Sequence, residues 1–97
     1  MDIHNIKDYN DIMATYDPNK NLTKNILSKY EKIKILGVRA EQLQRGAIPN
    51  VDVDEDNFIA LEIAKQELHE RKIPFMVVRK LPNGKKEYWK LDDMIIL

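Results

Sequence analysis

Apolar residues recur at steps of three and four in two stretches of the chain, the spacing of one helix face. These stretches predict helices over about residues 28–45 and 58–71. From residue 75 the pattern changes to apolar runs with strand character, separated by Asn83-Gly84, a pair typical of a hairpin turn. The sequence therefore predicts two helices followed by an antiparallel hairpin of residues 75–80 and 87–90.

One face of the first predicted helix carries an unusual residue. Tyr30, Ile33, Gly37, Ala40 and Leu43 follow one another at steps of three and four. A glycine inside a helix costs about 1 kcal/mol relative to alanine. We therefore expect another backbone or side chain to lie close to Gly37.

The ends of the first helix carry recognisable signals. Ser28 and Glu31 have the spacing of a capping box, in which each side chain binds the other's backbone N–H. Gly46 suits the left-handed position after a helix, and Pro49 prevents the helix from resuming.

The segment before the second helix alternates valine with acidic residues. Val51 and Val53 predict a short edge strand. Asp56 or Asn57 is expected to cap the second helix.

Residues 1–22 carry scattered charge, net −2, and no sustained hydrophobic period. We expect a flexible N-terminal tail, with one short amphipathic helix that orders on a partner. The predicted organisation is a tail over 1–22 and a single domain over 23–97. The predicted fold class is α+β, with the two helices packed with the small antiparallel sheet of the C-terminal hairpin.

Charge is balanced overall but unevenly distributed. Sixteen basic and sixteen acidic residues give a net charge of zero, which provides no reason to expect tight nucleic-acid binding. Residues 22–49 carry net +4 and residues 50–57 carry net −4. Two interpretations stay open: these are solvated surfaces, or the basic helix faces an acidic partner.

No residues have the pattern of a catalytic, metal or cofactor site. His4 and His69 have no ligands spaced to converge with them, and there is no cysteine. No apolar run approaches the roughly 20 residues of a membrane span, and no signal peptide is visible at the N-terminus. We expect an intracellular protein with no active site of its own, no cofactor and no membrane partner.

Three blocks of sequence resemble one known family. The residues are Ser28–Glu31 with Leu36–Leu43, then Leu61–Ala64 with Glu67-Leu68 and Arg71–Phe75, then Arg79–Gly84 with Glu87–Trp89. Their order resembles the small assembly subunit of multisubunit RNA polymerases, which comprises bacterial omega, archaeal subunit K and the sixth shared eukaryotic subunit. The hairpin and its Ile-Pro-Phe entry are closer to the archaeal and eukaryotic branch. The sequence departs from the family at Ile59-Ala60, where an Asp-Pro pair is common.

The resemblance implies a non-catalytic subunit of a DNA-directed RNA polymerase. Such a subunit clamps the largest subunit, promotes assembly of the core enzyme, meets other core subunits and reaches nucleic acid only through the complex. The implied contact residues are Tyr30, Glu31, Gly37, Arg39, Ala40 and Gln42. The implied location is the nucleus or cytoplasm, or the virion if a large DNA virus encodes the chain.

Two alternatives stay open at this stage. Arg39 is either an anchor to the large subunit or one half of an ion pair within the chain. The chain itself is either a polymerase subunit or a free-standing nucleic-acid-binding or transcription-regulatory module, which would use the basic first helix or residues 85–89.

Overall fold

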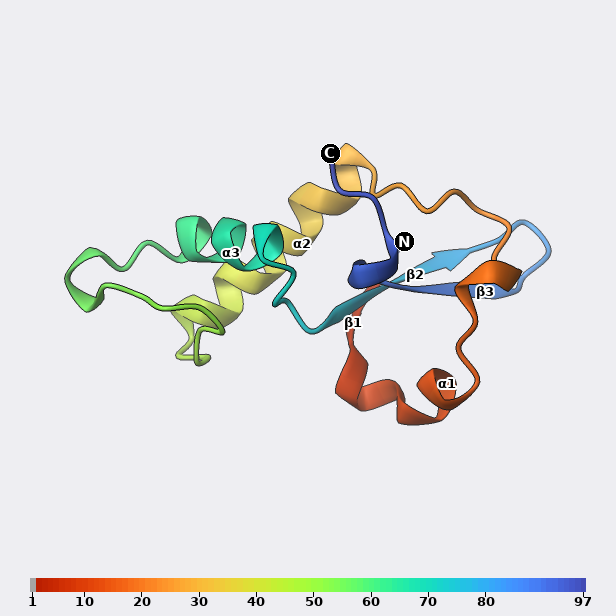
Figure 1. Ribbon diagram of the computed structural model, residues 1–97, viewed down its shortest axis with the longest axis horizontal. Coiled ribbons are helices and arrows are strands. Elements are labelled where there is room, and N and C mark those ends of the chain that lie inside the picture. The colour runs from red at the N-terminus through yellow and green to blue at the C-terminus, as the bar shows by residue number, and fades with distance from the viewer. Residues whose placement is uncertain (1) are drawn as a thin grey trace. The chain divides into compact units, whose positions relative to one another are not determined.

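The computed structural model describes the backbone of residues 2–97 and the side chains of all of these except residues 2, 7 and 8. The chain forms two compact units (Figure 1). One contains the residues as far as Ser28 together with Pro74–Leu97, and the other is Lys29–Ile73. Each unit is described by itself.

The first unit is built on an antiparallel sheet of three strands, β1 (Asp2–Asn5), β2 (Phe75–Lys80) and β3 (Lys86–Lys90), in the order β1-β2-β3 (Figure 1). Val78 lies opposite Asp2 on one side and Tyr88 on the other. Gly84 has φ +81° in the turn between β2 and β3, as the Asn-Gly pair predicts. The α+β class and the hairpin are confirmed, and the sheet gains β1 as a third strand.

The core of this unit centres on β2, whose first four residues are buried on both faces of the sheet. Leu27 and Trp89 are buried as well, as are Leu91 and Met94 in and beside the short 3-10 helix η4 (Leu91–Asp93). Residues 95–97 are less covered than their apolar character suggests, since Leu97 is 85% exposed.

Residues 2–22 contain more regular structure than the single short helix that the sequence predicts. After β1 come the 3-10 helix η1 (Ile6–Tyr9), helix α1 (Asn10–Ala14) and the 3-10 helix η2 (Pro18–Lys20). Strand β1 was not predicted, because its pairing partner β2 lies about 70 residues further along the chain. Mobility of this segment, and a domain boundary at residue 22, stay predictions.

The second unit consists of α2 (Lys29–Gln44), α3 (Ala60–His69) and the long connection between them, which includes the 3-10 helix η3 (Glu55–Asn57). Both predicted helices are confirmed, within two residues of the expected ends. The helices pack together through Ile35, Leu36 and Leu43 on α2 and an apolar face on α3. The buried positions of α3 are Ala60, Ile63, Ala64, Glu67 and Leu68.

Both helices end in the same way. Gly46 has φ +100°, its N–H donates to Leu43 O at 3.2 Å, and Ala47 N–H donates to Gln42 O at 3.0 Å. These two bonds form a Schellman motif and confirm the role predicted for Gly46. At the end of α3 the left-handed position is taken by Arg71, with φ 57°.

The predicted cap of the second helix, Asp56 or Asn57, is wrong. Its N-cap is Ile59, which is extended and makes no side-chain cap bond. Asp54 instead caps the separate η3 helix, where its carboxylate accepts from Asp56 N–H at 3.0 Å. The predicted edge strand at Val51 and Val53 is also wrong, because residues 51–54 pair with no strand.

Candidate partner-binding surface

The outward face of α2 is apolar and uncovered within the chain. Tyr30 is 67% exposed, Ile33 is 60% exposed, and Gly37 between the helix turns is also exposed. A Cβ added at Gly37 would meet no atom within 4 Å. The predicted close approach to Gly37 is therefore wrong within this chain, since α2 buries its opposite side against α3. We call Tyr30, Ile33 and Gly37 the α2 stripe.

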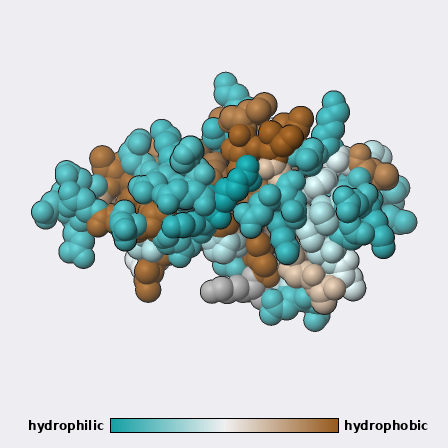
Figure 2. All heavy atoms as spheres, viewed as in Figure 1, coloured by the Kyte–Doolittle hydropathy of each residue, from teal (hydrophilic) through white to brown (hydrophobic). Residues whose placement is uncertain are grey.

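The α2 stripe belongs to a larger set of exposed apolar side chains. Hydrophobic atoms reach the surface of the molecule in several places (Figure 2). In the unit Lys29–Ile73 the large exposed ones are Tyr30, Ile33, Ile48, Phe58, Ile59 and Leu61. Of these six side chains, only Tyr30 and Ile33 lie together on one helix face. The α2 stripe is therefore the most regular apolar surface of this unit.

Behind the stripe lies a buried ion pair between the two helices. Arg39 Nε and Nη2 lie 2.7 and 2.8 Å from the two carboxylate oxygens of Glu67. Arg39 is 5% exposed and Glu67 is fully buried. The hydrogen bonds that Arg39 donates to Glu67 raise the pKa of Arg39, and they outweigh the opposing effect of burial. Of the two alternatives for Arg39, the structure shows the ion pair within the chain.

The same pair binds the loop that follows α2. Arg39 Nη2 donates to Ile48 O at 3.2 Å, and the backbone N–H of Asn50 donates to Glu67 at 2.8 Å. The Asn50 amide also donates to Lys72 O at 2.9 Å, just beyond α3. Glu67 and Asn50 were not among the site residues predicted from the sequence. The one available signal was that Glu67 falls on the apolar face of the second helix.

The six residues predicted to bind a partner do not share one surface. Tyr30 and Gly37 lie on the exposed face, and Ala40 is partly exposed. Glu31 is 6% exposed, and Gln42 is half-buried and accepts from Arg39 Nη1 at 3.2 Å. The structure thus separates an outward group from an inward group formed by Glu31, Arg39 and Gln42.

In the first unit, a buried carboxylate holds the segment before α2 against the sheet. Glu87 on β3 accepts hydrogen bonds from Leu22 N–H, from Thr23 N–H at 3.0 Å and from the Thr23 hydroxyl at 2.6 Å. Burial alone raises the pKa of Glu87. These hydrogen bonds, together with the charge of Arg79, bring that pKa below its usual range.

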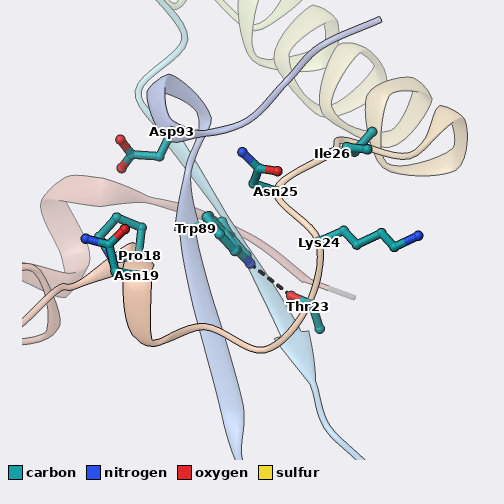
Figure 3. Close-up of a pocket in the computed structure, with 8 residues that line it drawn as sticks. All are labelled: Pro18, Asn19, Thr23, Lys24, Asn25, Ile26, Trp89 and Asp93. Atoms are coloured by element: carbon teal, nitrogen blue, oxygen red, sulfur yellow. Dashed lines mark hydrogen bonds between the residues drawn. The ribbon is translucent and has the colours of Figure 1, made fainter.

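Arg79 and Trp89 hold the same segment. Arg79 donates to Lys24 O at 2.6 Å and to Ile26 O at 2.9 Å. The Trp89 indole donates to the Thr23 hydroxyl at 3.0 Å (Figure 3). An open hollow of about 680 Å³ lies beside these groups. It is lined by Pro18, Asn19, Thr23, Lys24, Asn25, Ile26, Trp89 and Asp93.

A comparison with known protein families gives a match that includes the helical unit. The family model described as RNA polymerase Rpb6 matches residues 21–75, which include α2 and α3. The chain belongs to the RNA polymerase Rpb6 family. The family predicted from the sequence is thereby confirmed.

Several curated proteins resemble this Rpb6 family chain. It is 40% identical over 74 residues to DNA-directed RNA polymerases II and V subunit 6B of Arabidopsis thaliana, covering 76% of this chain and 51% of that protein. It is 39% identical over 75 residues, 77% of this chain and 54% of the other, to a probable subunit RPABC2 of RNA polymerases I, II and III of Caenorhabditis elegans. The Saccharomyces cerevisiae subunit RPABC2 is 40% identical over 70 residues, 72% of this chain and 44% of that protein. The chain spans about half the length of these curated relatives.

Among the side chains that the structure describes, no three histidine, aspartate or glutamate residues gather as metal ligands. No helix in the described part of the chain is both long enough and apolar enough to span a bilayer.

Proposed function

We propose that this protein is a non-catalytic subunit of a DNA-directed RNA polymerase, with no active site of its own, and that it binds the largest subunit. The proposal rests first on its family membership, since the relatives are named as polymerase subunits. Other core subunits are further partners, and nucleic acid is reached only through the complex. The protein would then be found where that polymerase works, in the nucleus or cytoplasm.

The proposed contact surface rests on a single observation, the uncovered α2 stripe. An aromatic and a branched apolar side chain precede, on the same helix face, a glycine at which an added Cβ would meet no atom within 4 Å. Exposed tyrosine and isoleucine are suited to an interface core, since they bury large apolar areas. The missing side chain at Gly37 leaves room for a partner's backbone to come close, and Ala40 extends this small-residue surface.

The inward residues contribute indirectly. Arg39 and Gln42 bond to one another, and Arg39 binds Glu67 on α3. We propose that these contacts fix the orientation of α2, so that the stripe is preorganised for its partner. Glu31, which is buried on the same side of α2, belongs with them.

The mechanism of assembly is linked equilibria. A protein that binds only the folded form of a partner segment stabilises that form by mass action. Loss of this subunit should therefore loosen the bound segment of the largest subunit rather than abolish catalysis outright.

The test is a tagged pull-down from the native source with washes at low and then high salt. We expect the two largest polymerase subunits to stay bound after the high-salt wash. Gly37→Leu should abolish this recovery, because it fills the space left for the partner. Lys65→Leu is the matched control, since Lys65 is a 53% exposed side chain on the neighbouring helix.

The stability of the Gly37 variants, measured on the isolated chain, distinguishes a binding defect from a folding defect. Because nothing lies within 4 Å of the added Cβ, Gly37→Ala should stabilise the isolated chain by about 1 kcal/mol. Recovery of nucleic acid alone, lost at high salt, would instead support the free-standing binding module.

A further inference from the structure

The outer edge of β3 is closed by side chains in place of a strand. β3 is the last strand of the sheet. The Asn21 amide donates to Tyr88 O at 2.9 Å, and Lys90 N–H donates to the Tyr16 hydroxyl at 3.1 Å. Tyr88 and Lys90 are two residues apart, the interval at which a strand presents backbone groups to one neighbour. The two side chains thus take the places of a strand's N–H and C=O.

Tyr16 is held at this edge by two further contacts. Its hydroxyl donates to Asp93 at 2.8 Å, and Lys90 Nζ lies 5.0 Å from the centre of its ring. We call Tyr16 and Asn21 with these bonds the edge latch. The next residues along the chain, Leu22 and Thr23, are bound separately by Glu87. The latch can therefore open while the neighbouring segment stays in place.

We propose that the outer edge of β3 is a docking site for an extended acidic segment of a partner protein, which adds as a fourth strand when the edge latch opens. Addition of a strand to a sheet edge is a common mode of peptide recognition, with affinity from the backbone and specificity from alternate side chains.

The charges along β3 indicate which kind of segment would bind at its outer edge. Lys86, Tyr88 and Lys90 alternate along one side of β3 and are exposed or half-exposed, while Glu87 and Trp89 on the other side are buried. A strand with acidic residues on either side of an aromatic one would face two lysines and a tyrosine. A second copy of the chain fits poorly, because antiparallel pairing about Tyr88 would place Lys86 opposite Lys90.

A short hollow beside the edge supports the same site. It has a volume of about 300 Å³ and is lined in part by Tyr16, Asn21, Lys86 and Tyr88. Lys20 and Asp17 line the same hollow. Two lysines, Lys20 and Lys86, against one aspartate, Asp17, give this lining a net positive charge, which favours an acidic strand.

The test measures binding of three synthetic peptides to the whole chain by NMR titration. The first has the core Glu-Val-Phe-Val-Glu, the second has lysine in place of both glutamates, and the third is the first with alternate amides N-methylated. Tyr16→Phe combined with Asn21→Ala removes the latch bonds. Since apparent affinity rises with the fraction of binding-competent molecules, this variant should bind the acidic peptide about tenfold more tightly.

A second variant keeps the latch intact. Lys86→Glu changes only an exposed charge and should weaken binding of the acidic peptide about fivefold, as expected for loss of about 1 kcal/mol. Its result decides the matter even if the latch variant fails to fold. Equal binding of the acidic and lysine peptides, or of the N-methylated peptide, would overturn the proposal.

Discussion

Removal of the Glu67 carboxylate should be the most damaging single change in the helical unit. That carboxylate is fully buried and accepts three hydrogen bonds, two from Arg39 and one from the Asn50 backbone. In Glu67→Ala the Arg39 guanidinium stays buried without a counter-charge. Breaking a buried ion pair in this way costs about 3–5 kcal/mol.

This cost is large beside the stability of a small protein. A chain of this size unfolds with roughly 5–15 kcal/mol. Each kcal/mol lowers the melting temperature by about 4–8 °C in domains of 60–100 residues, so we expect a fall of at least about 12 °C. The assay is urea denaturation followed by the helical circular dichroism signal, which reports on α2 and α3.

The paired substitution tests whether the cost comes from the orphaned charge. Arg39→Met with Glu67→Leu fills the same space with apolar atoms, and such replacements are often neutral or stabilising. We expect the double variant to lie within about 2 kcal/mol of the wild type, far above Glu67→Ala. The reasoning is refuted if Glu67→Ala costs less than about 1 kcal/mol, or if the double variant is as unstable as the two single variants added together.

Three further predictions concern single groups. The lowered pKa of Glu87 means that its carboxylate stabilises the fold at neutral pH, and that this contribution is lost as pH falls below about 4.3 towards the folded pKa; Glu87→Gln should flatten the loss of stability in urea melts between pH 5 and 3. Burial and the Asp93 hydrogen bond raise the pKa of Tyr16 to about 12, against an opposing bond from Lys90 N–H. Its protonated form therefore stabilises the fold below pH 10, and the contribution is lost as pH rises towards 12; in Tyr16→Phe this alkaline step should disappear from a melting curve series. Arg71 has φ 57°, where a side chain is strained, so Arg71→Gly should raise the free energy of unfolding by about 1 kcal/mol, and an unchanged denaturation midpoint would contradict this.

Local signals in the sequence were sufficient for the elements that depend on neighbouring residues. Gly46 ends α2 and Gly84 turns the hairpin because each supplies a left-handed backbone conformation that other residues rarely adopt. The two helices follow from long periodic stretches. The predicted cap of α3 was wrong because Asp56 and Asn57 belong to the separate η3 helix, which Asp54 caps. The longer helix begins after them, with Ile59 at its N-cap position.

The inward and outward faces of α2 could not be assigned from the sequence. Both carry apolar residues at helical spacing, and only α3 decides which one is covered. Burial of Arg39 was equally hidden, because charged residues are seldom fully buried and its partner lies 28 residues away. In the sequence, an apolar helix face that stays uncovered after folding has the same hydrophobic pattern as one that becomes part of the core.

The pairing of β1 with β2 has a consequence for the order of folding. Strand β1 precedes the helical unit in the chain, yet its partner β2 begins only after that unit, at Phe75. The intervening stretch Lys29–Ile73 forms a compact unit of its own. On the ribosome α2 and α3 can therefore pack together while β1 is still unpaired, and the three-stranded sheet forms last. Contacts between residues so distant in sequence form slowly, so a nascent chain passes through a stage in which its helices are complete and its first strand is still unpaired.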